Sequence, residues 1–164
     1  MRQHMKLTLL IFLIFSTGCV SVQIGPKKGE QAKNIKFKTP PEPFVSIDSS
    51  DVDYGWKNGI NSTSISFRSV CNDTIDPSLD SIQQSLIYGL ENVQVLKSQR
   101  VPFQQREALN SIILGKLDGI FTKMEFMILK KNNCTYTLSY IALDKMFDSD
   151  YLTFKDFLKN FEVP

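Results

Sequence analysis

A strict alternation of apolar and polar residues, present in two separate segments, most constrains how this chain can fold. Between residues 134 and 142 nearly every second residue is aromatic or aliphatic, and Thr or Ser residues lie between them. Residues 62–71 alternate in the same way. A period of two places successive side chains on opposite faces, so both segments are predicted to be half-buried β-strands. Cys134 and Cys71 fall on the apolar faces of these strands.

Two turn signals add neighbours to the later of the two strands. Asp118-Gly119 favours a two-residue hairpin, which needs a strand on each side of the turn. Residues 112–117 and 121–129 are therefore predicted to be those strands, although the apolar spacing within residues 103–117 would also suit a helix. Asn132-Asn133 is a second turn, which comes directly before the later alternating strand.

Helical spacing of apolar residues marks two further segments. Asp76-Pro77 offers a capping carboxylate and a proline suited to the first helical position, and Leu and Ile residues recur at helical spacing from residue 79 onward. A second helix is predicted over residues 149–161, where its Tyr, Phe and Leu residues would cover a sheet. The remaining predictions are strands at 44–47 and 93–101, and a loop or hairpin at 48–61. Together these elements predict an α+β fold, in which an antiparallel sheet is flanked by helices.

The order of these elements resembles the Mog1/PsbP-like family. The resemblance rests on Trp56 near the start, Ser66-Phe67 late in a strand, a Leu117-Asp118-Gly119 turn, Glu125 in the next strand, Tyr136 and Tyr140 after it, and a last helix ending over Phe157 to Phe161. It covers residues 44–164 and implies an α/β/α sandwich. Known members of the family bind proteins or assist the assembly of larger complexes, and their shared residues include no catalytic set.

The N-terminus has the residue order of a secretory signal. Arg2 and Lys6 precede an apolar run over residues 7–15. This run is about half the length that spans a bilayer as a helix. Ser16-Thr17-Gly18-Cys19 resembles the bacterial lipobox, in which the cysteine thiol is lipidated and cleavage precedes the cysteine. Ser16 departs from the aliphatic residue that is usual there, which leaves an ordinary secretory signal as the alternative.

These features divide the chain into three parts. Residues 1–18 are expected to be a cleaved signal peptide, and residues 19–43 a lipidated Cys19 with a flexible tether rich in Lys, Gly and Pro. Residues 44–164 are expected to form a single globular domain. The resemblance to lipoproteins implies a palmitate-bearing protein of the cell envelope. Val20, in place of an Asp after the cysteine, favours the periplasmic face of the outer membrane.

Charge and histidine content exclude several classes of function. Removing residues 1–18 takes Arg2 and Lys6 from the 19 basic side chains and none from the 17 acidic ones, so the mature chain carries 17 of each. A neutral chain lacks the basic surface that nucleic-acid binding needs. The single histidine, His4, lies in the signal. The mature protein therefore has no Ser-His-Asp or Cys-His catalysis and no histidine-ligated metal.

The cysteine count predicts one disulfide. With Cys19 lipidated, Cys71 and Cys134 remain as an even pair in an oxidising compartment. Each lies on the apolar face of its own strand, so both are expected to point toward the same core. Two buried free thiols are the alternative, because cysteine is among the most commonly buried residues.

No motif in the sequence assembles a catalytic, cofactor or metal site. Asp51-Val52-Asp53 begins like a calcium loop but lacks most of its oxygen ligands. Asp73, Asp76 and Asp80 surround a helix start, where capping and the helix dipole explain them. Arg106-Glu107 is most simply a solvated surface pair.

The sequence therefore predicts a non-enzymatic accessory or adaptor lipoprotein, held to the membrane through Cys19, whose domain docks on another envelope protein. No cofactor is expected. The first alternative is a binder of a small apolar or lipid ligand that serves an envelope transport system. That ligand would occupy an apolar groove between the sheet and the last helix. A histidine-free hydrolase is the second alternative.

The signal predicts how the protein is processed. We expect the mature chain to begin at an acylated Cys19, and Cys19→Ala to leave unprocessed, unlipidated precursor. Intact-mass measurement of the protein isolated from bacterial membranes checks both statements. A mature protein with a free N-terminus at another residue would contradict the assignment.

Overall fold

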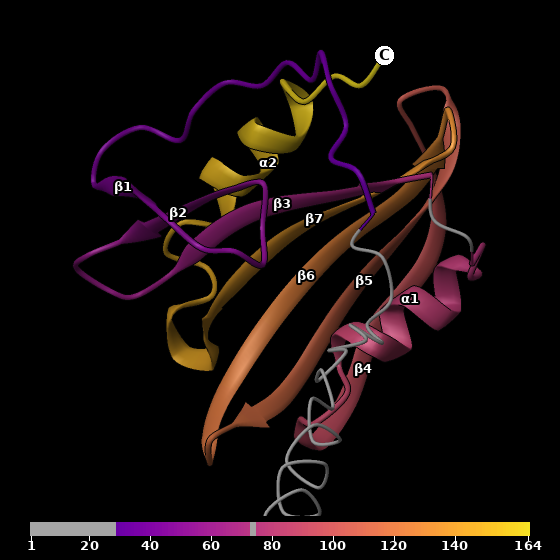
Figure 1. The fold of residues 1–164 in the computed structure, drawn as a ribbon. Coiled ribbons are helices and arrows are strands. Elements are labelled where there is room, and N and C mark those ends of the chain that lie inside the picture. Colours follow the sequence, from indigo (N-terminus) through magenta and orange to yellow (C-terminus); the bar gives the residue numbers. More distant parts are fainter. Residues whose placement is uncertain (1–28, 73–74) are drawn as a thin grey trace, which may run out of the picture.

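The computed structural model describes residues 29–72 and 75–164, which form one seven-stranded antiparallel sheet with a helix on each face (Figure 1). The strands are β1 (Phe44–Ile47), β2 (Tyr54–Asn58), β3 (Ser64–Cys71), β4 (Glu91–Phe103), β5 (Arg106–Leu117), β6 (Ile120–Lys131) and β7 (Cys134–Leu143). The helices are α1 (Leu79–Leu86) and α2 (Tyr151–Lys159), with a short 3-10 turn η1 (Asp144–Met146) between β7 and α2. The strand order is β1-β2-β3-β7-β6-β5-β4. The predicted α+β class is confirmed.

Three tight turns connect β4 to β7 in sequence order. Both central residues of each turn have positive φ angles: these are Gln104 and Gln105, Asp118 and Gly119, and Asn132 and Asn133. Two consecutive positive φ angles define the type I′ turn, whose twist matches that of the strands it joins. The turns predicted at Asp118 and Asn132 are confirmed. The sequence gives no signal for the turn at Gln104-Gln105, because glutamine is not a typical residue of such turns.

The connection from β3 to β4 carries the chain from the middle of the sheet to its far edge. α1 lies in this connection and packs on β5 and β6, where its Ile82 and Leu86 contact a buried apolar cluster. The N-cap of α1 is Ser78, whose side-chain oxygen accepts a hydrogen bond from the Ser81 amide at 3.1 Å. The predicted capping by Asp76 is therefore wrong, because Ser78 lies one residue before the first helical turn and takes that role.

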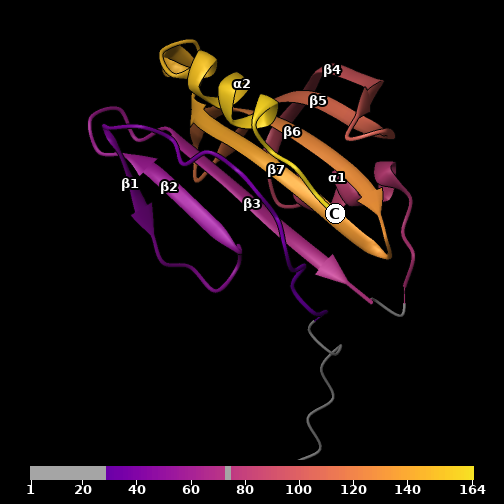
Figure 2. The same cartoon turned by 90° about the horizontal axis from the view of Figure 1, so that it is seen from above.

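The opposite face of the sheet is covered by α2 (Figure 2). An aromatic cluster fills the space between them. The ring of Tyr140 stacks on Phe154 with centroids 5.4 Å apart, and Trp56 meets Phe157 edge to face at 5.6 Å. Phe161 packs on Phe67 in the same way, at 5.2 Å. Such ring pairs stabilise beyond the area that they bury, so α2 is a major part of the core.

Residues 30–37 are tied to the folded domain, although the sequence predicts a flexible tether as far as residue 43. The backbone of Glu30 pairs with Cys71, and that of Lys36 pairs with Glu162. The Phe37 ring lies 5.4 Å from Phe67, inside the aromatic cluster. The predicted domain boundary at residue 44 is therefore too late. Isolated apolar residues such as Phe37 show no period, so periodicity does not reveal that they are anchored.

A disulfide joins Cys71 and Cys134, the pair expected from the sequence. The two residues lie directly opposite each other, at the end of β3 and the start of β7, with Cα atoms 4.0 Å apart. Cys71 is buried on the α2 face. The bond closes a loop of 63 residues that contains α1 and strands β4, β5 and β6.

The packing of α2 predicts which of its side chains stabilise the fold. Phe157→Ala should lower the free energy of unfolding by about 3–5 kcal/mol, because a buried Phe is removed from a filled core. Leu152→Ala on the same helix is the matched control, since Leu152 is 81% exposed. Urea unfolding followed by circular dichroism measures both. Equal stability of the two variants would show that α2 is peripheral.

The disulfide yields a second stability prediction. In the chain-entropy model a loop of this size gives roughly 4 kcal/mol of stabilisation. The double variant Cys71→Ser and Cys134→Ser should therefore unfold at much lower urea concentration, and reduced wild-type protein should behave in the same way. A free thiol in the native, unreduced protein at position 71 or 134, detected by labelling and mass spectrometry, would contradict the pairing.

Candidate functional site

The space between the sheet and α2 is filled rather than open. Phe154, Phe157 and Phe161 are at most 2% exposed, and their rings contact Tyr140, Trp56 and Phe67, respectively. The expected apolar groove between the sheet and the last helix is therefore wrong, because the aromatic residues that suggested it occupy that space themselves.

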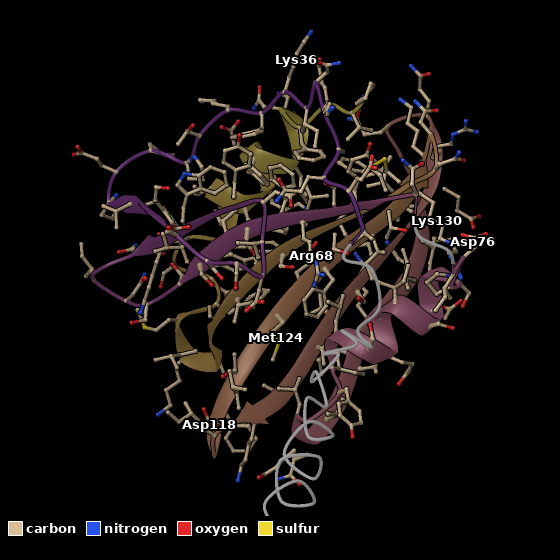
Figure 3. The ribbon with its side chains drawn as sticks, viewed as in Figure 1. Lys36, Arg68, Asp76, Asp118, Met124 and Lys130 are labelled. Atoms are coloured by element: carbon tan, nitrogen blue, oxygen red, sulfur yellow. A yellow bond between two sulfur atoms is a disulfide. The ribbon has the colours of Figure 1, made fainter. Side chains whose placement is uncertain are left out.

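A groove lies instead on the other face of the sheet, beside α1. α1 covers β5 and β6 and leaves the α1 face of β3 and β7 uncovered. The resulting groove has a volume of about 300 Å³. In Figure 3 the labelled Arg68 lies on this face, which is turned toward the viewer. The pairing of β3 with β7 thus forms the floor of the groove.

The floor is polar because alternate residues of both strands point to this face. Arg68 lies opposite Thr137, and Ser66 lies opposite Ser139. Their neighbours along the strands, such as Phe67, point into the aromatic core on the other side. The alternation that predicted two half-buried strands therefore also lines up a guanidinium group with several hydroxyl groups.

The sides of the groove are mostly apolar. Ile82 and Leu86 of α1 form one wall, and Val52 lies on the opposite side, before β2. Val70 continues the floor toward the end of β3. Asp51 lies at the rim and is exposed. The groove therefore combines a charged, hydroxyl-rich floor with apolar walls, which is typical of sites for small ligands.

A second surface feature lies at the β5–β6 hairpin. Four large apolar side chains are 41–57% exposed there: Leu117, Ile120, Phe121 and Leu143. We call these four residues the apolar tip. Three of them, Ile120, Phe121 and Leu143, line a hollow of about 400 Å³ with η1, and the Lys116 ammonium lies 4.8 Å from the centre of the Phe121 ring. Gathered apolar side chains of this kind mark interaction surfaces more often than single exposed ones do.

A buried carboxylate connects the sheet to α2. Glu125 in β6 is 0% exposed, and its Oε1 atom accepts a hydrogen bond from Asn110 Nδ2 at 2.7 Å. Lys155 of α2 places its Nζ atom 3.6 Å from the same oxygen. Because Glu125 is enclosed, this cluster holds α2 against the sheet and offers no surface to a solute. The sequence marked Glu125 only through the family resemblance, since nothing local indicates that it is buried.

The tyrosines near this cluster remain protonated over the ordinary pH range. Burial, and then the neighbouring Glu125 carboxylate, raise the pKa of Tyr151 well above its usual range. Burial and then the Asp150 carboxylate raise the pKa of Tyr140 to about 12, and its hydroxyl donates to the Phe147 carbonyl at 2.7 Å. Both phenols therefore serve as hydrogen-bond donors rather than as bases.

The acidic and basic residues singled out in the sequence are spread over the surface. Asp80 pairs with Arg100, and Asp76 pairs with Lys130, at separate places. Glu107 forms an ion pair with Arg100, with a carboxylate oxygen 3.8 Å from the guanidinium group. Asp53 accepts hydrogen bonds from the amide and hydroxyl of Ser69, which fixes the turn before β2. Cys19 lies outside the described residues.

Two negative findings concern the described part of the chain, residues 29–72 and 75–164. It contains no group of three or more His, Cys, Asp or Glu side chains placed to hold a metal ion. None of its helices has the length and apolar character needed to cross a bilayer.

The fold is PsbP-like. No protein-family model and no curated protein sequence matches the chain. Among solved structures, LpqN of Mycobacterium tuberculosis, described as involved in cell envelope biogenesis, is 12% identical, with a TM-score of 0.58 over 84% of this chain and 87% of that one. A Bacteroides thetaiotaomicron protein is 10% identical, with a TM-score of 0.55 over 84% of this chain and 49% of that one. The cyanobacterial PsbP of Synechocystis is 9% identical, with a TM-score of 0.51 over 86% of this chain and 99% of that one. At these identities the likeness defines the fold alone.

Proposed function

We propose that this protein is a lipid-anchored, non-enzymatic accessory protein of the bacterial cell envelope, whose domain docks on another envelope protein through the apolar tip. The anchor is an acylated Cys19, which makes the membrane the first partner. The periplasmic face of the outer membrane is the proposed location. The observation that carries the docking proposal is the position of the tip relative to the place where the chain enters the domain.

The apolar tip and the start of the described chain lie at opposite ends of the sheet. β6 begins at Ile120, in the tip, and ends at Lys131, which pairs with Cys134. Cys134 is bonded to Cys71, and the backbone of Glu30 pairs with that of Cys71. The full length of β6 therefore separates the tip from the point where the chain joins the sheet.

Two lengths support an orientation in which the apolar tip points away from the anchor. The ten Cα–Cα steps from Cys19 to Gly29 span at most about 35 Å when fully extended. The twelve residues of β6 span about 40 Å. The tether is thus no longer than the sheet, so a domain that stands on its tether holds the apolar tip away from the anchoring membrane. The apolar tip is therefore expected to contact the surface of another protein and not the anchoring membrane.

The known likeness of the fold supports an envelope role in a general way. LpqN is itself described as taking part in cell envelope biogenesis, and it matches most of this chain in fold. The absence of histidine from the mature sequence and the enclosure of Glu125 both favour binding over catalysis. The polar groove beside α1 favours a second candidate function, which is the binding of a small ligand.

Photocrosslinking in living cells tests the docking proposal. A benzophenone amino acid at position 121 should crosslink one discrete envelope protein, and the same group at Val45 should not. Val45 is the matched control because it is 60% exposed on β1, an edge strand that contributes no residue to the apolar tip. Adding Ile120→Asp should abolish the crosslink from position 121 and leave the melting temperature nearly unchanged, because Ile120 is already 57% exposed.

Two results would contradict docking through the tip. One is a crosslink from position 121 to phospholipid alone, which would assign this surface to the membrane. The other is an equal pattern of crosslinks from positions 121 and 45, which would show that the tip selects no partner.

A further inference from the structure

The guanidinium group of Arg68 has no ion-pair or hydrogen-bond partner among the residues that the structure describes. Arg100, by contrast, pairs with Asp80 and Glu107 on the surface. Arg68 stands in the floor of the groove beside α1, where its exposed side chain lines the same hollow as Ile82 and Leu86. A guanidinium group has five donors in a planar fork, which suits a carboxylate or phosphate that it can hold with two parallel hydrogen bonds.

Four hydroxyl groups surround this cation in the floor. They belong to Ser66, Thr135, Thr137 and Ser139, and none of these side chains forms a hydrogen bond within the described residues. Thr137 lies directly opposite Arg68 and is only 9% exposed. Polar groups in such a sheltered place take their partners from water or from a ligand. The floor therefore offers several free donors on one small area.

The walls and the volume limit what such a ligand can be. Ile82, Leu86 and Val70 provide apolar surface next to the polar floor. A volume of about 300 Å³ is at the lower end of the range for small-molecule sites, so the ligand is small. We infer that the groove beside α1 binds a small amphipathic carboxylate, whose anionic group lies on Arg68 and the floor hydroxyls and whose apolar part lies against α1.

The charges that line the groove favour a ligand with a single negative charge. Arg68 is the one basic residue among those that line the groove, and Asp51 is the one acidic residue. A ligand with one negative charge is matched by the guanidinium, whereas a phosphate dianion would leave excess negative charge close to Asp51. A carboxylate therefore fits better than a phosphate monoester with the same apolar group.

The inference goes beyond the proposed docking function and does not depend on it. The groove and the apolar tip share no residue. Loss of ligand binding would leave the crosslink from position 121 unchanged, and loss of that crosslink would leave ligand binding unchanged. The two proposals therefore fail separately.

Calorimetric titration with hexanoate tests the inference. The protein is used as purified from cells, in nanodiscs if it is membrane-bound, with empty nanodiscs as the blank. Hexanoate should bind saturably to the wild-type protein. Arg68→Gln should weaken binding by about tenfold or more, because a hydrogen-bonded charge is lost. Arg68→Lys should fall between the two, and Asp51→Asn should bind at least as tightly as wild type.

Matched ligands and a second variant keep the test decisive. Acetate lacks the apolar part and 1-hexanol lacks the charge, so each should bind more weakly than hexanoate. Thr137→Val removes one floor hydroxyl at nearly constant volume and should weaken binding several-fold with little change in melting temperature. Arg106→Gln, at the start of β5 and outside the groove, is the control for unspecific charge effects and should bind like wild type.

The opposite results overturn the inference. These are the absence of saturable hexanoate binding, equal affinity of the Arg68→Gln and wild-type proteins, or 1-hexanol binding as tightly as hexanoate. Tighter binding of hexyl phosphate than of hexanoate would overturn the assignment to a singly charged carboxylate.

Discussion

β3 pairs with β7 along its whole length, from Ser64 opposite Ile141 to Cys71 opposite Cys134. This pairing joins the three N-terminal strands to the four strands that follow α1, and it brings together residues more than sixty positions apart in the sequence. The aromatic core under α2 is built on one side of this seam, because Phe67 and Tyr140 come from its two strands. The groove beside α1 is built on the other side. Both faces therefore depend on the same set of backbone hydrogen bonds.

The two faces of the seam differ in what covers them. On one face, the Phe residues of α2 reach the sheet and leave its side chains fully enclosed. On the other, α1 is short and lies over β5 and β6, so the hydroxyl groups and Arg68 at the seam remain accessible. A short helix thus leaves room for a polar floor that a longer helix would have covered. The filled aromatic core and the open groove therefore lie on opposite sides of one sheet.

Local pattern explains which parts of this fold can be predicted from the sequence. The strand at 44–47, the turn at Asp118-Gly119 and the alternation after Cys134 carry their own signals, and all three are present in the structure. The turn at Gln104-Gln105 carries none, because its conformation is imposed by the strands on either side. Phe37 is likewise held by rings from distant strands. The groove could not be predicted, since Arg68 and Thr137 become neighbours only when the seam forms. The lipid anchor lies outside the described residues and remains a prediction.

The connection between Glu30 and Cys71 has a mechanical consequence. Any pull on the chain before Gly29 reaches the sheet first at this backbone pair, next to the bond between Cys71 and Cys134. Without the disulfide, a force applied at the end of β3 would break the hydrogen bonds between β3 and β7 one after another. With the disulfide in place, both strands bear the force from the first residue. The domain is thus reinforced at the point where its N-terminal segment joins the sheet.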